Sequence, residues 1–98
     1  MRVRFLSSAE LDVFEAFDHY NAIDDDGRTA DRFLDEIEQA KRSISERPRA
    51  WMEIEPGVRH KVLHRFPFAL IYEIEADEIR VFAVAHHSRR PGYWRNRE

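Results

Sequence analysis

Three short runs of alternating apolar and polar residues in the second half of the sequence constrain the fold most strongly. They span residues 58–65, 68–75 and 78–86, and they are separated by Phe66-Pro67 and Ala76-Asp77. Such alternation is typical of β-strands with one buried face, and connections this short join antiparallel neighbours. The sequence therefore predicts a three-stranded antiparallel meander that begins after the turn Pro56-Gly57.

Two helical patterns precede the meander. Apolar residues recur every three to four positions over residues 11–20, and a cleaner repeat runs from Ala30 to Ile44 and ends before Pro48. A short strand over residues 2–6 completes the order βααβββ. Because both helices come before the meander, we expect an α+β fold in which a two-helix hairpin packs on one face of an antiparallel sheet.

Length and composition favour one small cytoplasmic domain. With 98 residues, 43% of them hydrophobic, the chain has enough apolar side chains for a single core, so residues 1–98 are predicted to form one domain. The absence of cysteine excludes a disulfide framework and a thiolate metal site. The apolar start is too short for a signal peptide or a membrane span, which predicts a cytoplasmic protein without a membrane partner.

The charge is unevenly distributed along the chain. The net charge is −3, but residues 1–55 carry a balance of −6 and residues 56–98 a balance of +3. Such an asymmetry predicts an anionic partner for the basic half, with an ordinary solvated surface as the alternative. Strand alternation predicts that the basic side chains share the sheet face away from the helices, together with Glu73. The predicted basic face consists of Arg2, Arg4, Arg59, Lys61, Arg65, Arg80 and His86.

The last predicted strand is followed by a tail rich in cations and aromatic rings. Arginine forms paired hydrogen bonds with phosphate, and Tyr and Trp offer flat faces to unpaired bases, so this composition suits nucleic acid or another anionic target. In the alternative interpretation the tail is an exposed basic terminus whose aromatic rings pack onto the core. The residues concerned are His86, His87, Arg89, Arg90, Tyr93, Trp94, Arg95 and Arg97.

The same region contains the side chains that metal-independent RNA cleavage requires. That reaction needs a base, an acid and a cation near the phosphate, and His87, Tyr93 and Arg59 are the candidates, with Lys61 and Arg89 as further cations. Histidines that alternate on strands are more often surface or packed residues than catalysts. Since the pair His86-His87 lacks metal-ligand spacing, we predict no metal and no cofactor.

The sequence resembles the RelE/ParE superfamily of type II toxin–antitoxin systems over essentially its whole length, most closely the ParE-like toxins. The element order βααβββ agrees with this family. The matching segments are residues 32–38, 57–59, 65–68, 71–74, 84–91 and 93–94.

The resemblance implies a bacterial growth-inhibiting toxin that a cognate antitoxin neutralises. RelE-like members cut mRNA on the ribosome, whereas ParE-like members bind DNA gyrase. Tyr93 and His87 fall where RelE-like enzymes place catalytic residues, and Arg59 and Lys61 lie on the matching strand. The turn Phe66-Pro67 follows the ParE form, which favours gyrase as the target.

Three hypotheses therefore follow from the sequence: a gyrase-binding toxin, a ribosome-dependent endoribonuclease, and a domain that binds an antitoxin but has lost toxicity. The endoribonuclease would use His87, Tyr93 and Arg59. The residues predicted to bind the target are Arg59, Lys61, Arg65, Arg80, Arg89, Arg90 and Trp94.

Overall fold

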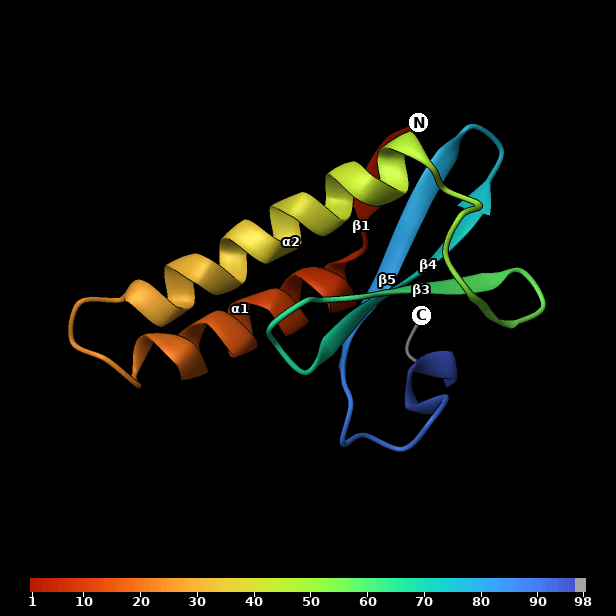
Figure 1. The fold of residues 1–98 in the computed structure, drawn as a ribbon. Coiled ribbons are helices and arrows are strands. Elements are labelled where there is room, and N and C mark those ends of the chain that lie inside the picture. The colour runs from red at the N-terminus through yellow and green to blue at the C-terminus, as the bar shows by residue number, and fades with distance from the viewer. Residues whose placement is uncertain (97–98) are drawn as a thin grey trace.

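The computed structural model describes residues 1–96 and contains two helices and one five-stranded sheet (Figure 1). Arg97, which belongs to the predicted basic tail, lies outside the described residues. The elements are β1 (Arg2–Phe5), α1 (Ser7–Asn21), α2 (Arg28–Glu46), β2 (Glu53–Glu55), β3 (Val58–Val62), β4 (Phe68–Glu75), β5 (Glu78–His86) and the short 3-10 helix η1 (Tyr93–Asn96). The α+β class and the helix hairpin are thus confirmed.

The sheet is mixed rather than purely antiparallel. Its strand order is β1-β5-β4-β3-β2, and β1 pairs with β5 in parallel, whereas the other neighbours are antiparallel. The parallel pairing follows from the helix hairpin, because parallel neighbours need a long crossover connection. The edge strand β2 was missed, because three residues are too few to establish an alternation.

An acidic turn fixes the start of α2. The carboxylate of Asp24 accepts hydrogen bonds from the backbone N–H of Thr29 (3.2 Å) and from its hydroxyl group (2.7 Å), and Asp26 accepts one from the N–H of Arg28. These contacts satisfy donors that the first turn of a helix leaves unpaired. Gly27 supplies the left-handed backbone conformation (φ 70°) that the tight entry requires.

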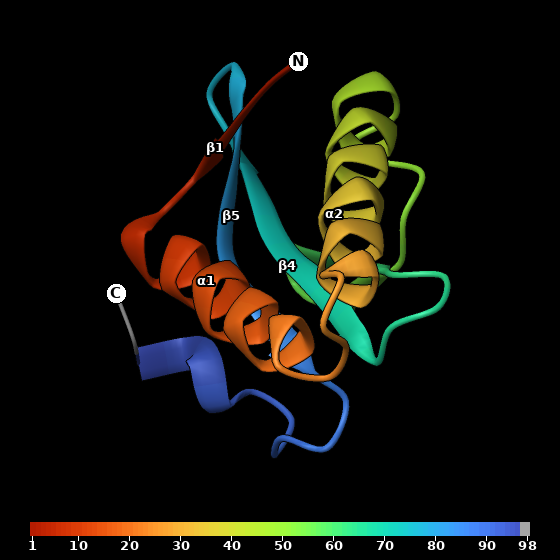
Figure 2. The same cartoon turned by 90° about the vertical axis from the view of Figure 1, so that its left-hand side faces the viewer.

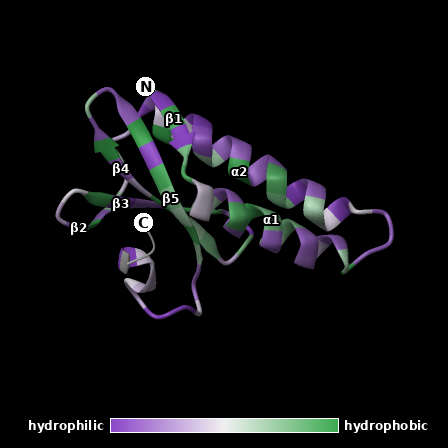
Figure 3. Cartoon of the chain, turned by 180° about the vertical axis from the view of Figure 1, so that it is seen from behind, coloured by the Kyte–Doolittle hydropathy of each residue, from purple (hydrophilic) through white to green (hydrophobic). Residues whose placement is uncertain are grey.

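The main core lies between the helix pair and the sheet. α1 and α2 lie side by side with β4 and β5 behind them (Figure 2). Hydrophobic and hydrophilic residues both occur along the length of α2 (Figure 3). Phe33 is fully buried in an aromatic cluster, with ring centroids 5.3 Å from Tyr20, 5.5 Å from Phe66 and 5.6 Å from Phe68. Most of the predicted apolar repeat of α2 is buried in this core, whereas Leu34 of the same repeat is exposed.

A β-bulge in β5 changes the predicted alternation. Ile71 pairs with Ala83 and Tyr72 pairs with Val81, so Phe82 is the extra residue. Beyond the bulge, Val84 belongs to the core under the helices, whereas Ala83 lies on the opposite face. Uninterrupted alternation along residues 78–86 predicts that Ala83 faces the helices with Val81, and this prediction is wrong because one inserted residue exchanges the two faces.

The sheet face away from the helices carries a smaller apolar cluster. Ala69, Ile71 and Ala83 are buried there beneath Trp94 of η1, which is 7% exposed. In Figure 1 the C-terminal segment lies on the other side of the strands from α2. No helix within residues 1–96 is long and apolar enough to span a membrane.

Candidate functional site

The side chains that were predicted to share one basic face lie on both faces of the sheet. Arg59 pairs with Tyr72 and Lys61 with Leu70, both of which belong to the core under the helices. Side chains of directly paired residues lie on the same face, so Arg59 and Lys61 are on the helix side. The prediction that Arg59 and Lys61 face away from the helices is therefore wrong. Val58 packs against the apolar cluster on the far face, so the residues of β3 alternate in the opposite sense from the one predicted.

His86 also lies on the helix side, beyond the bulge. It pairs with Phe68, and the two rings make an edge contact with centroids 5.0 Å apart. The predicted basic face therefore loses three of its members to the opposite face.

The arginines that do lie on the predicted face are neutralised. Arg4 and Arg80 both donate to Glu78, at 3.0 Å and 3.1 Å, and Arg80 also pairs with Glu75 at 3.0 Å. Hydrogen bonds from Arg4 and Arg80 hold the pKa of Glu78 below its usual value. The network joins β1 to β5 and leaves little net positive charge for an anionic ligand.

Arg59 has a structural role in the loop before β2. Its guanidinium donates to the carbonyl oxygens of Trp51 (2.8 Å) and Arg49 (3.3 Å) and pairs with Glu53 at 3.4 Å. Below it, the buried Tyr72 hydroxyl donates to the carbonyl of Pro48 at 2.7 Å. Burial raises the pKa of Tyr72 to about 12, against the opposing effect of the Arg59 charge.

Lys61 is held in the same region. Its ammonium group lies 4.0 Å from the ring centroid of Trp51, in cation–π geometry. Arg59 and Lys61 thus anchor the loop over residues 47–52 to the helix side of the sheet.

Three of the predicted target-binding arginines are exposed. Within the described residues, Arg65, Arg89 and Arg90 have no ion pair. The backbone N–H of Arg65 is fixed by the Glu36 carboxylate at 3.0 Å, and Arg89 stacks on Tyr93 with 4.1 Å between guanidinium and ring centroid. These cations remain available at the end of the sheet.

Trp94 is a packed residue rather than an exposed stacking surface. Its ring lies against Phe82 with centroids 5.3 Å apart. The alternative interpretation, in which the aromatic rings of the tail pack onto the core, is therefore correct for Trp94.

Two of the candidate catalytic residues, His87 and Arg59, are not brought together. His87 follows β5, and its N–H donates to the carbonyl of Pro67 at 2.8 Å, next to the face that carries His60. Arg59 lies on the other face, where its donors are taken by loop carbonyls and Glu53. His87 and Arg59 are therefore separated by the sheet. No group of three or more potential metal ligands occurs within residues 1–96.

His60 makes stability dependent on acid pH. Burial, and secondarily the charge of His87, lowers the pKa of His60 below 6.5, so the fold favours its neutral form. The stabilisation is complete above pH 6.5 and is lost as the pH falls through the lowered pKa.

We therefore expect the free energy of unfolding, measured by urea titration, to fall between pH 7 and pH 5, and the His60→Gln variant to show a smaller fall. His87→Gln should reduce the fall in part, because it removes the secondary cause. Equal pH slopes in the wild type and His60→Gln would contradict this assignment.

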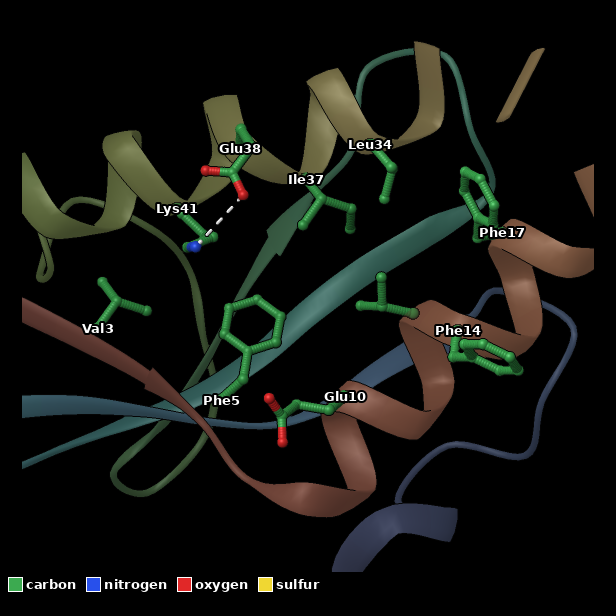
Figure 4. A pocket seen from close by; sticks show the side chains of 10 residues that line it. Val3, Phe5, Glu10, Phe14, Phe17, Leu34, Ile37, Glu38 and Lys41 are labelled. Atoms are coloured by element: carbon green, nitrogen blue, oxygen red, sulfur yellow. Dashed lines mark hydrogen bonds and ion pairs between the residues drawn. The ribbon is translucent and has the colours of Figure 1, made fainter. Parts of the chain in front are cut away.

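An apolar groove lies between β1, α1 and α2 (Figure 4). Its lining residues are Val3, Phe5, Glu10, Val13, Phe14, Phe17, Leu34, Ile37, Glu38 and Lys41. Phe14 is 67% exposed and Leu34 is 36% exposed. Glu38 pairs with Lys41 at 3.3 Å on one rim, and Glu10 lies on the other.

The groove was not predicted from the sequence, because the apolar repeats of both helices indicate a buried core rather than an exposed surface. Phe14 belongs to the three-to-four repeat of α1, yet it lies at the outer edge of that stripe. Leu11 belongs to the same repeat and is 55% exposed. The apolar stripe of α1 is thus wider than the part of the helix that packs on the core, and this width is visible in the sequence.

Comparisons with known proteins agree with the fold. Residues 3–91 match the family of the ParE toxin of the type II toxin-antitoxin system parDE. The structure is similar to the chromosomal ParDE TA system from P. aeruginosa, with a TM-score of 0.73, 23% sequence identity, and coverage of 88% of this chain and 95% of that chain. No curated protein sequence matches the chain.

A helix hairpin on one sheet face with an open apolar groove defines a small α+β protein that offers a surface for a partner. Since the match extends over residues 3–91, the chain belongs to the ParE toxin family of type II toxin–antitoxin systems.

Proposed function

We propose that this chain acts as a single-domain toxin that inhibits bacterial growth by binding DNA gyrase and that a cognate antitoxin neutralises by occupying the apolar groove. The groove is the observation that carries the antitoxin part of the proposal. Large apolar side chains that remain exposed together mark partner-binding surfaces. Membership of a toxin–antitoxin family makes an antitoxin the natural partner.

The chemistry of the groove indicates what the antitoxin segment presents. Phe5, Phe14 and Leu34 form apolar walls, which suit a helix or extended segment with apolar anchors at regular spacing. The Glu38 carboxylate is paired with Lys41, whereas Glu10 remains at the opposite rim. We therefore expect a basic antitoxin residue to face Glu10.

Gyrase as the target is supported by the resemblance to ParE-like toxins and by the exposed cations of the tail. Arg65, Arg89 and Arg90 extend from the end of the sheet where the β3–β4 turn meets the tail, since His87 bonds to Pro67. Exposed arginines without carboxylate partners suit an acidic protein surface or DNA held by the enzyme.

Purified protein tests this target directly. Added in excess to gyrase and plasmid DNA, it should inhibit supercoiling and increase cleaved DNA, and the double variant Arg89→Glu/Arg90→Glu should lose most of this effect. The Arg28→Gln variant, which changes an exposed arginine at the helix hairpin tip, is the matched control. Unchanged supercoiling and cleavage at excess wild-type protein would count against gyrase as the target.

The endoribonuclease alternative makes a different prediction for His87 and Tyr93. Loss of a general acid or base reduces catalysis by about 10²–10⁴-fold. Because Arg59 and His87 lie on opposite sides of the sheet, we expect His87→Ala and Tyr93→Phe to remain toxic when expression is induced. Replication should stop before translation in these cells. Loss of toxicity in both variants, with translation stopping first, would support the endoribonuclease.

A further inference from the structure

The carboxylate of Glu36 on α2 holds the connection between β3 and β4, which residues 63–67 form. Its Oε1 accepts hydrogen bonds from the backbone N–H groups of His64, at 2.8 Å, and Arg65, at 3.0 Å, and its Oε2 accepts a longer one from Arg65 at 3.2 Å. Glu36 precedes the two donors by 28 and 29 residues, so these contacts are tertiary. One carboxylate thus anchors two consecutive residues of the connection to the helix hairpin.

The two anchored N–H groups depend on this side chain. In the part of the chain that the structure describes, the N–H groups of His64 and Arg65 have no backbone acceptor, whereas the preceding N–H, of Leu63, donates to the carbonyl of Phe68 at 2.9 Å. Backbone donors without a protein partner have only water to bond with, which leaves an exposed segment free to move. The conformation of the backbone at residues 64 and 65 is therefore fixed by Glu36.

The rest of the connection is held independently. The ring of Phe66 packs in the aromatic cluster, with centroids 4.9 Å from Tyr20 and 5.5 Å from Phe33. The carbonyl of Pro67 accepts a hydrogen bond from the N–H of His87 at 2.8 Å, which ties the start of the tail to the connection. Loss of the Glu36 contacts therefore affects residues 64 and 65 and leaves the tail in place.

We propose that Glu36 is a positioning residue for target binding, which fixes the backbone from which Arg65 presents its guanidinium at the end of the sheet that also carries the tail cations. This inference rests on the proposed function, in which Arg65 contacts the target. An ordered backbone reduces the conformational freedom that the Arg65 side chain loses when it binds. Glu36 thus contributes to target binding without touching the target.

The charge of Glu36 alone would have the opposite effect. A carboxylate close to a target-binding arginine lowers the positive potential there, so its removal should strengthen the attraction to an anionic target. A positioning role predicts weaker binding when the carboxylate is removed. The direction of the change therefore distinguishes the two roles.

Glu36→Ala is expected to raise the protein concentration for half-maximal inhibition of gyrase supercoiling about two- to tenfold, the range for ordering one long side chain on binding. Glu36→Gln should stay close to the wild type, because its carbonyl oxygen still accepts both N–H groups. Asp35→Ala is the matched control, since Asp35 is an exposed carboxylate one position earlier on α2 that accepts neither hydrogen bond. It should not weaken inhibition. Inhibition by Glu36→Ala at or above the wild-type level overturns the proposal.

A double-mutant cycle shows whether Glu36 acts through Arg65. In an Arg65→Gln background, Glu36→Ala should cause no further loss of inhibition, whereas in an Arg89→Gln background it should cause its full loss. Equal losses in the two backgrounds overturn the proposal, because general destabilisation would act in both. An Arg65→Gln variant that inhibits gyrase as the wild type does overturns it as well.

Amide hydrogen exchange separates the anchor from the proposed target. The amides of His64 and Arg65 should lose their protection in Glu36→Ala and keep it in Asp35→Ala, while the amides of β4 stay protected in both. Equal protection of residues 64 and 65 in Glu36→Ala and the wild type overturns the positioning role. If the wild-type protein leaves gyrase unaffected, the proposed target and the role of Glu36 in binding it are both overturned, whereas lost protection would still show that Glu36 anchors the connection.

Discussion

Replacement of Phe14 by glutamate is expected to weaken antitoxin binding by at least about 30-fold, because truncating or charging a central anchor of an interface costs about 2–4 kcal/mol. Phe14 is 67% exposed and lines the groove with Phe17 and Leu34. A carboxylate there would be desolvated by the antitoxin without a partner. Isothermal titration with the proposed cognate antitoxin measures the effect.

Met52→Glu is the matched control for this experiment. Met52 is 68% exposed, so the two substitutions introduce the same charge at equally exposed apolar positions, but Met52 lies outside the groove. We expect Met52→Glu to bind as the wild type does and both variants to unfold at wild-type temperature. Equal affinity of Phe14→Glu and the wild type would exclude the groove as the antitoxin site.

The second large effect is expected at Phe33. This side chain is fully buried and its ring contacts Tyr20, Phe66 and Phe68, so Phe33→Ala removes one aromatic ring from the centre of a cluster. Such substitutions cost about 3–5 kcal/mol, and for a domain of this size the midpoint of thermal unfolding should fall by roughly 15–30 °C.

Phe14→Ala is the appropriate comparison, since it removes the same ring from an exposed position of the same helix hairpin. Surface substitutions of this kind usually change stability by about 0.5 kcal/mol or less. Scanning calorimetry of the two variants therefore separates burial from side-chain identity. A similar midpoint for both would contradict the placement of Phe33 at the centre of the core.

The sequence predicted the helices and the meander because their signals are local. The repeat from Ala30 to Ile44 and the two-residue turn between β4 and β5 depend on neighbours within the same segment. The parallel direction of β1 depends on a distant pairing with β5, which alternation alone cannot specify, whereas β2 pairs with the nearby β3 but is too short to show an alternation.

The predicted surfaces depended on alternation continuing without interruption. A single extra residue, Phe82, moved Ala83 to the other face, and the burial of Val58 under the tail placed Arg59 on the helix side. Arg65 in the β3–β4 connection and Arg89 and Arg90 in the tail are exposed, as a target-binding role requires.

The parallel pairing of β1 with β5 has a consequence for synthesis in the cell. Arg2 pairs with Glu78 and Phe5 with Val81, so the first strand can pair with β5 only after most of the chain has been translated. Pairings this distant in sequence form slowly. The sheet that supports the groove and the tail is therefore completed only when β5 leaves the ribosome. An antitoxin already present at that moment meets the toxin as it first becomes able to act.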